Sequence, residues 1–368
     1  MKNFGIFTIS GFNIRAVIAL CRFCYQSKIP IHLVAKNSTD PIYITKYKAD
    51  VFIERTTAVL DPVDFCGWLS EIKIKYGYKR VLIAPSSEFF NRFLLKNRKL
   101  IESAGGIIPL VDEELYESIS DKYSFAGICE TYGIKTPAEF DAHPENFPFV
   151  AKPLKYSAAD GRQLKPYLLH CHENWDDFLK TEKSSDFYYQ EFIHGKSFYL
   201  LLYISKFGKV TKYAQENLIQ QTNGGSIILA RQSDFHLSEE SDNYISMLKD
   251  KKFFGLVMIE VRLCEKTGSY IMIEANPRMW GPIQFASDNG INLFEELVND
   301  FTGEKNTSSI QNSSEYYFWS GGFSKNDNLF SCHNFDSDEF LKNIKHIMSA
   351  DIFNREDTLA LYREELNI

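Results

Sequence analysis

The chain has 368 residues, of which 44% are hydrophobic and 24% are charged, as in a folded globular protein of two or three domains rather than a disordered one. Its formal net charge of −7 argues against a nonspecific nucleic-acid binder. No apolar run approaches the roughly 20 residues of a membrane span, and the N-terminus lacks the apolar stretch of a signal peptide, so we expect a cytoplasmic protein.

The first third of the chain alternates short apolar runs with segments of helical apolar spacing. Helices are expected over 13–26 and 62–76, and strands over 4–9, 29–35, 51–53 and 80–84. This alternation predicts a parallel sheet covered by helices. Only Ser10-Gly11 follows the first run, so the glycine-rich fingerprint of dinucleotide-binding domains is absent.

The pattern changes at about residue 118. A helix is expected from near Ile119 to Tyr132, and Gly133 is a plausible end for it. From Phe147 onward strands and hairpin turns are expected, followed by a polar loop over 306–314 and by helices in the last 35 or so residues. A second, antiparallel region is therefore predicted after the parallel one.

Two strand-like runs, 254–263 and 269–278, carry the strongest functional signal. The turn between them, Lys266-Thr267-Gly268, has glycine where a three-residue hairpin loop takes left-handed backbone. The register predicted from this loop pairs Glu265 with Ser269. An antiparallel hairpin is the expected structure.

Counting back from that turn sets Glu260 opposite Glu274. Facing carboxylates repel each other, so this pair points to a cation between them. Strand period two puts Arg262 on the face of Glu260, and Asn276 and Arg278 on the face of Glu274. These oxygen donors suit a magnesium ion, and substrate phosphates would complete its coordination shell. Arg278 would bind the oxygens of those phosphates. A solvated polar face of an amphipathic hairpin is the competing interpretation.

The run Glu274-Ala275-Asn276-Pro277-Arg278-Met279-Trp280-Gly281, with its upstream acidic strand, resembles the metal-binding signature of the ATP-grasp superfamily. The resemblance covers roughly 118–300, and the whole chain looks like the carbamoyl-phosphate-synthase-like members. It implies an α/β protein with three parts. These are a Rossmann-like pre-ATP-grasp domain over 1–117, an α+β ATP-grasp domain with antiparallel sheets over 118–305, and a C-terminal extension packing on it over 306–368.

The resemblance also implies an activity, an ATP-dependent ligase. ATP phosphorylates a carboxylate to an acylphosphate, and an amine then displaces phosphate, with Mg²⁺ (or Mn²⁺ in its place) bridging the phosphates. In this family's terms Glu260, Glu274 and Asn276 look like the metal ligands. Arg278 looks like the residue that contacts the γ-phosphate and the acylphosphate, and Arg262 is a further catalytic candidate.

The nucleotide-binding residues follow from the same resemblance. Lys152 resembles the nucleotide lysine, with an exposed strand lysine as the competing interpretation. Lys122 resembles the earlier basic residue, although Asp-Lys at a helix start also satisfies capping preferences. The run 188–195 resembles the strand and hinge that hold adenine, or else a plain buried strand, and its candidate contacts are Gln190, Glu191 and the backbone of Phe192 and Ile193.

Three features depart from the family pattern or stand apart from it. The phosphate loop is poor in glycine, and its candidates are Ser157 and Gly161, with Asp160 between them. Lys196-Ser197 stands where the family often has an acidic residue for the ribose. Arg231, after a hairpin turn, is expected either to pair with the carboxylate substrate or to be a surface arginine.

The expected partners are a small-molecule carboxylate and an amine, with a homodimer as the expected assembly if there is one. Joining an amino acid to a sugar acid in surface-polysaccharide biosynthesis is one refinement of this hypothesis. A phosphotransferase on the same fold and a non-catalytic nucleotide-binding module are the alternatives.

Overall fold

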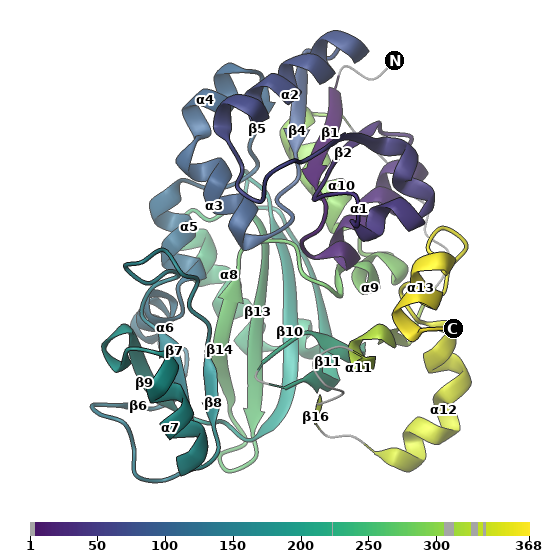
Figure 1. The fold of residues 1–368 in the computed structure, drawn as a ribbon. Coiled ribbons are helices and arrows are strands. Elements are labelled where there is room, and N and C mark those ends of the chain that lie inside the picture. The colour runs from purple at the N-terminus through teal and green to yellow at the C-terminus, as the bar shows by residue number, and fades with distance from the viewer. Residues whose placement is uncertain (1–3, 223, 305–312, 325–329, 334–335) are drawn as a thin grey trace.

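The computed structural model describes residues 4–222, 224–304, 313–324, 330–333 and 336–368. Its strands form three sheets, one parallel and two antiparallel (Figure 1). Short 3₁₀ helices connect some of the elements: Pro41–Ile44, Lys46–Asp50, Ser184–Asp186 and Asp234–Leu237. Within these described ranges, no helix combines the length and the apolar character needed to span a membrane.

The parallel sheet has the strand order β3-β2-β1-β4-β5, and every pairing in it is parallel. Its strands are β1 (Phe4–Ile9), β2 (Ile31–Ala35), β3 (Val51–Glu54), β4 (Arg80–Ile83) and β5 (Gly106–Ile107). Successive residues enter opposite cores: Ile6 packs with α1 (Ile14–Gln26), and Phe7 packs with α2 (Pro62–Tyr76). Burial on both faces explains the continuous apolar runs, and it confirms the predicted strands and helices.

Four helices lead from this sheet to the rest of the chain: α3 (Glu88–Lys96), α4 (Arg98–Ser103), α5 (Glu113–Ser120) and α6 (Lys122–Thr131). Only α6 was predicted from the sequence, and the predicted helix also included the end of α5. The predicted stop is confirmed, because Gly133 lies just beyond α6 with φ of 68°.

The small antiparallel sheet has the order β6-β9-β7-β8. Its strands are β6 (Glu139–Phe140), β7 (Phe149–Pro153), β8 (Tyr167–Leu169) and β9 (Phe187–Glu191). The helix α7 (His172–Thr181) packs on β8 through the buried Phe178, which shares a small core with Phe149. This helix was not predicted, because its polar composition hides the few residues that it buries.

The large sheet has the order β14-β13-β10-β11-β12-β15, and β16 pairs with β11. Its strands are β10 (Gly195–Ile204), β11 (Val210–Gln221), β12 (Ile227–Gln232), β13 (Gly255–Cys264), β14 (Tyr270–Asn276), β15 (Tyr316–Phe318) and β16 (Phe330–Cys332). The remaining helices are α8 (Glu239–Asp250), α9 (Ile283–Asp288), α10 (Leu293–Thr302), α11 (Gly321–Ser324), α12 (Ser337–Ser349) and α13 (Leu359–Leu366). The helices expected near the C-terminus are confirmed, whereas most of the predicted loop over 306–314 lies outside the described residues.

The hairpin of β13 and β14 places Glu260 opposite Glu274, as predicted. The route differs from the prediction, because the backbone N–H of Cys264, not of Glu265, donates to the carbonyl oxygen of Ser269, at 2.9 Å. The pairing therefore starts one residue off. A β-bulge that leaves Ile273 without an opposite residue then brings the two glutamates together.

Candidate active site

A cavity of about 280 Å³ lies between the small antiparallel sheet and the β13–β14 hairpin. Most of the site residues predicted from the sequence line it. They are Lys122, Lys152, Gln190, Glu191, Phe192, Ile193, Glu260, Arg262, Glu274, Asn276 and Arg278. Residues from distant parts of the chain thus meet at one place.

The two facing glutamates have different electrostatic surroundings. Glu260 is 5% exposed, and burial together with the facing Glu274 raises its pKa to about 7. Burial alone would raise the pKa of Glu274 as well, but Lys122, Asn276 and Lys152 outweigh it and lower the pKa to about 2. The Lys122 ammonium lies 2.5 Å from Glu274 Oε2, and Asn276 Nδ2 donates to Glu274 Oε1 at 2.7 Å.

Lys152 is a buried cation on β7. Its ammonium donates to the carbonyl oxygen of Ile273 at 2.8 Å, and Ile273 is the bulged residue of β14. Burial and the nearby Lys122 lower the pKa of Lys152 to about 8. The alternative of an exposed strand lysine is therefore wrong, since Lys152 is only 6% exposed.

A chain of buried amides and a hydroxyl stands behind Glu260. Ser197 donates to Glu260 Oε1 at 3.3 Å and accepts from Asn217 at 2.9 Å, and Gln215 donates to Asn217 at 2.7 Å. All three of these side chains are fully buried. In the sequence, Ser197 stood out only as a departure from the family pattern, and nothing indicated its contact with Glu260.

Arg262 contacts the predicted adenine hinge. Its Nη1 donates to the carbonyl oxygen of Ile193 at 3.1 Å, and its guanidinium lies 5.4 Å from the centre of the Phe192 ring. Its Nε remains 4.0 Å from Glu260 Oε1. The Ile193 carbonyl, expected to read the adenine edge, already accepts a hydrogen bond from this arginine.

Gln190 offers the cavity an unused acceptor. Its side chain is 2% exposed, and Oε1 has no hydrogen-bond partner among the described residues. Buried polar atoms are rarely left unpaired, so this oxygen fits a donor supplied by a bound molecule.

A second cavity of about 170 Å³ adjoins the first. Lys122, Asn276, Arg278 and Pro166 line both of them. The other walls come from three segments: Glu88 at the start of α3, Ser120-Asp121 before α6, and the loop between β7 and β8 (Lys155, Tyr156, Gln163, Leu164 and Lys165).

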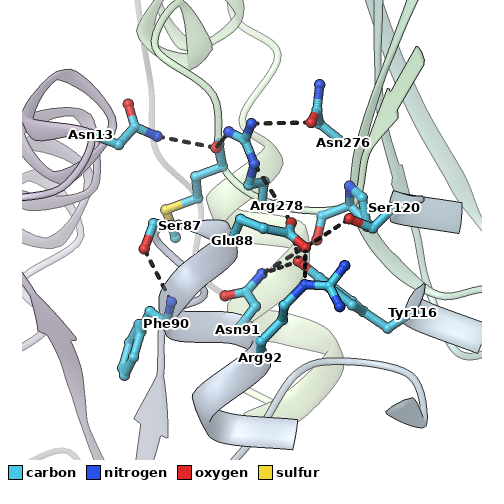
Figure 2. Close-up of polar contacts among 12 residues, drawn as sticks. Asn13, Ser87, Glu88, Phe90, Asn91, Arg92, Tyr116, Ser120, Asn276 and Arg278 are labelled. Atoms are coloured by element: carbon cyan, nitrogen blue, oxygen red, sulfur yellow. Dashed lines mark hydrogen bonds and ion pairs between the residues drawn. The ribbon is translucent and has the colours of Figure 1, made fainter. Parts of the chain in front are cut away.

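Glu88 gathers several donors at this second cavity (Figure 2). Its Oε1 accepts from Arg92 and from Ser120, each at 2.7 Å, and its Oε2 accepts from Tyr116 at 2.8 Å. Arg278 Nε lies 3.8 Å from the same Oε2, while Arg278 Nη2 donates to Asn276 at 3.0 Å. Glu88 thus connects the parallel-sheet region to the arginine that follows the metal-site residues.

Glu88 was not predicted as a site residue, although two features of the sequence before it point to a binding site. Pro85-Ser86-Ser87 follows β4 at the carboxyl edge of a parallel sheet, where ligands usually bind. Ser87 also caps α3, because its hydroxyl accepts from the backbone N–H of Phe90 at 3.3 Å. Together they mark a helix start that faces a binding site.

The structure does not bring three of the predicted residues to either cavity. Arg231 pairs with Glu216 at 2.9 Å and with Glu339 of α12 at 3.1 Å, so it holds a helix rather than a substrate. Ser157 and Gly161 belong to a turn whose Arg162 is bound by both carboxylate oxygens of Glu182, each at 2.8 Å. This turn lies outside both cavity walls.

The donor set fits magnesium. The buried Glu260 and the half-buried Glu274 face one cavity, and the Asn276 amide donates to Glu274. A divalent cation between the two carboxylates would remove their mutual repulsion. Within the part of the chain that the structure describes, no group of three or more His, Cys, Asp or Glu could hold a metal ion. Magnesium sites in proteins usually take further oxygen ligands from water and from substrate phosphates.

Comparison with solved structures shows the fold. The biotin carboxylase domain of Hydrogenobacter thermophilus 2-oxoglutarate carboxylase, solved with MgADP, ADP and bicarbonate, has a TM-score of 0.58 at 15% identity, over 87% of this chain and 73% of that one. An ADP complex of N5-carboxyaminoimidazole ribonucleotide synthetase has a TM-score of 0.59 at 12% identity, over 84% of this chain and 80% of that one. Campylobacter jejuni biotin carboxylase, solved with a nucleotide, has a TM-score of 0.57 at 12% identity, over 82% of this chain and 72% of that one.

No protein-family model and no curated protein matches the sequence. The likeness to solved structures shows the fold alone: the chain has the ATP-grasp fold that these carboxylases and synthetases share.

Proposed function

We propose that the protein is an ATP- and Mg²⁺-dependent ligase that activates a carboxylate as an acylphosphate and joins it to an amine. One observation carries this proposal. A cavity with a magnesium-type donor set meets a second cavity at Lys122, Asn276 and Arg278. The likeness to proteins solved with ADP or MgADP supports a nucleotide in the first cavity.

The domain assignment is part of the proposal. Residues 1–117 form a Rossmann-like pre-ATP-grasp domain, which the strand order β3-β2-β1-β4-β5 supports. Residues 118–305 form the nucleotide- and metal-binding domain, and 306–368 form the extension that packs on it.

Each residue has a positioning or charge-compensating role. Lys152 and Lys122 hold the nucleotide phosphates, while Gln190 and the Phe192 hinge hold the base. When bound at Glu260 and Glu274, Mg²⁺ would compensate the phosphate charge. Because both reactants must meet at one phosphorus atom, catalysis is mainly a matter of placement.

The chemistry is completed in the second cavity. A carboxylate oxygen attacks the γ-phosphorus, and the bond to the ADP oxygen breaks. The amine nitrogen then attacks the acyl carbon, the carbon–oxygen bond to phosphate breaks, and the amine loses a proton. Arg278, shared by the two cavities, is placed to compensate the charge that moves between them.

The test is the release of ADP and phosphate from MgATP, with a panel of acids screened against a panel of amines. An amino acid with a sugar acid is one pair in the panel. Release that requires one acid and one amine together supports the ligase. Glu274→Gln should lower it by roughly 100- to 1,000-fold, whereas Glu265→Gln, in the exposed turn of the same hairpin, should leave it unchanged.

Other outcomes would replace the proposal. A stable phosphorylated acceptor without amide would indicate a phosphotransferase. Binding of MgADP with no release across the whole panel would indicate a non-catalytic module.

A further inference from the structure

The second cavity contains both acidic and basic side chains, but its acids are already compensated. Arg92, which lies beneath the cavity, donates from Nε to Glu88 at 2.7 Å and from Nη2 to Asp121 at 2.9 Å. Tyr116 and Ser120 add hydroxyl donors to Glu88 (Figure 2). Neither carboxylate is therefore available to bind a cationic group of a substrate.

Two lysines of the cavity wall remain uncompensated. Lys155 and Lys165 form no ion pair within the described part of the chain. Glu182 interacts electrostatically with Lys165, but both oxygens of that carboxylate are held by Arg162. Both lysines are exposed, so their ammonium groups can move toward a bound anion.

The positions of the cations divide the cavity into two ends. Lys122 and Arg278 lie where it meets the nucleotide cavity, and Lys155 and Lys165 belong to the loop that forms another wall. Lys122 is paired with Glu274, and Arg278 lies near Glu88. A carboxylate that is to be phosphorylated needs the first end, which leaves the lysine pair for another part of the same molecule.

We infer that the acid substrate carries a second anionic group, a carboxylate or a phosphate, which Lys155 and Lys165 bind while the first carboxylate is activated beside Arg278. This inference rests on the proposed function and gives its substrate a chemical class, a small dianionic acid. The cavity of about 170 Å³ suits a small acid rather than a large conjugate. The two lysines are specificity-determining residues, and they take no part in phosphoryl transfer.

The test compares acids that differ only in the second charge: butyrate with succinate, valerate with glutarate, and glycerate with 3-phosphoglycerate. Each is measured with the amine panel by ADP and phosphate release, and separately by calorimetric titration into the protein saturated with MgADP. We expect the dianionic member of at least one pair to bind about tenfold more tightly or better. Succinate and glutarate report a second carboxylate, and 3-phosphoglycerate reports a phosphate.

The double variant Lys155→Gln/Lys165→Gln supplies the second readout. It should raise the KM or Kd of the preferred dianionic acid by about tenfold to 100-fold while leaving kcat and MgADP affinity unchanged. Lys345→Gln, an exposed lysine of α12, is the matched control.

Equal affinity for the two members of every pair, or a double variant that still binds its dianionic acid normally, would overturn the inference. The titration separates this failure from that of the proposed function. Dianionic acids that bind through the lysines without turnover would refute the ligase alone, and turnover of monocarboxylates with no charge preference would refute the inference alone.

Discussion

The two cavities of the candidate active site are built in different ways. The residues of the first cavity come mostly from the strands β7, β9, β13 and β14, so strand pairing fixes their positions. The second cavity is lined by helix starts and by the loop between β7 and β8. Long-range ion pairs, such as that of Arg92 with Asp121, hold these pieces together. The first arrangement suits an invariant ligand, and the second lets specificity change without disturbing a sheet.

The substitution with the largest expected effect lies in the first cavity and should lower the affinity for the nucleotide. Lys152→Met removes a buried ammonium from the strand-built cavity and leaves the Ile273 carbonyl without its donor. We expect MgADP affinity to fall by roughly tenfold to 100-fold, since charge-assisted hydrogen bonds contribute about 1.5–3 kcal/mol. Calorimetric titration measures this.

The matched control for Lys152 lies beside β14, the strand that supplies the acceptor of Lys152. Lys135 donates to Ser269 at 2.7 Å at an exposed position and lines neither cavity. Lys135→Met should bind MgADP normally. An equal loss in both variants would attribute the effect to folding rather than to the cavity.

A substitution in the second cavity should have an intermediate effect, which lowers the rate of phosphate release but not the affinity for MgADP. Glu88→Gln removes the charge that faces Arg278 and Arg92 in the second cavity. Because Arg278 then loses the carboxylate charge that faces its Nε, phosphate release should fall by about tenfold, with MgADP affinity unchanged.

Glu117→Gln is the control for Glu88. Glu117 also pairs with Arg92, at 2.7 Å, but it lines neither cavity. If this variant lost as much activity as Glu88→Gln, the effect would belong to Arg92 and its helix. A fall in MgADP affinity in Glu88→Gln would show that the two cavities are not separable.

The smallest effect is expected behind Glu260. Ser197→Ala removes a 3.3 Å hydrogen bond to that carboxylate and leaves the buried Asn217 amide without its acceptor. We expect a loss of about 1–2 kcal/mol in the free energy of unfolding. The Mg²⁺ concentration for half-maximal activity should rise by about threefold, if a bond of about 0.6 kcal/mol orients Glu260.

Two measurements check Ser197→Ala: denaturant unfolding and a magnesium titration of phosphate release. Lower stability with an unchanged magnesium dependence would mean that the hydroxyl supports the core and not the ligand.

The site residues that lie on strands could be predicted from the sequence more fully than those that lie on loops and helix starts. The hairpin that carries Glu260, Glu274 and Asn276 could be predicted from the sequence, because alternation with period two on both sides of a glycine turn indicates two paired strands. The parallel strands and their helices were also predictable, since burial on both faces leaves long apolar runs.

The rest depended on contacts that the sequence does not encode locally. Glu88 and Asp121 share the bridging Arg92 although they are far apart in the sequence, and Arg231 is bound by an acid from α12. The turn residue was wrong by one position, and the bulge at Ile273 compensated for that error in the predicted register.

That bulge has a consequence for how the protein tolerates substitution. The acceptor for Lys152 is a main-chain oxygen at position 273, which every amino acid supplies. A saturation mutagenesis scan should therefore find position 152 intolerant, while variants at position 273 keep the acceptor and are limited only by the packing of their side chain. Homologous sequences could keep the lysine while the residue at position 273 changes, so covariation between the two positions would be weak despite their direct contact.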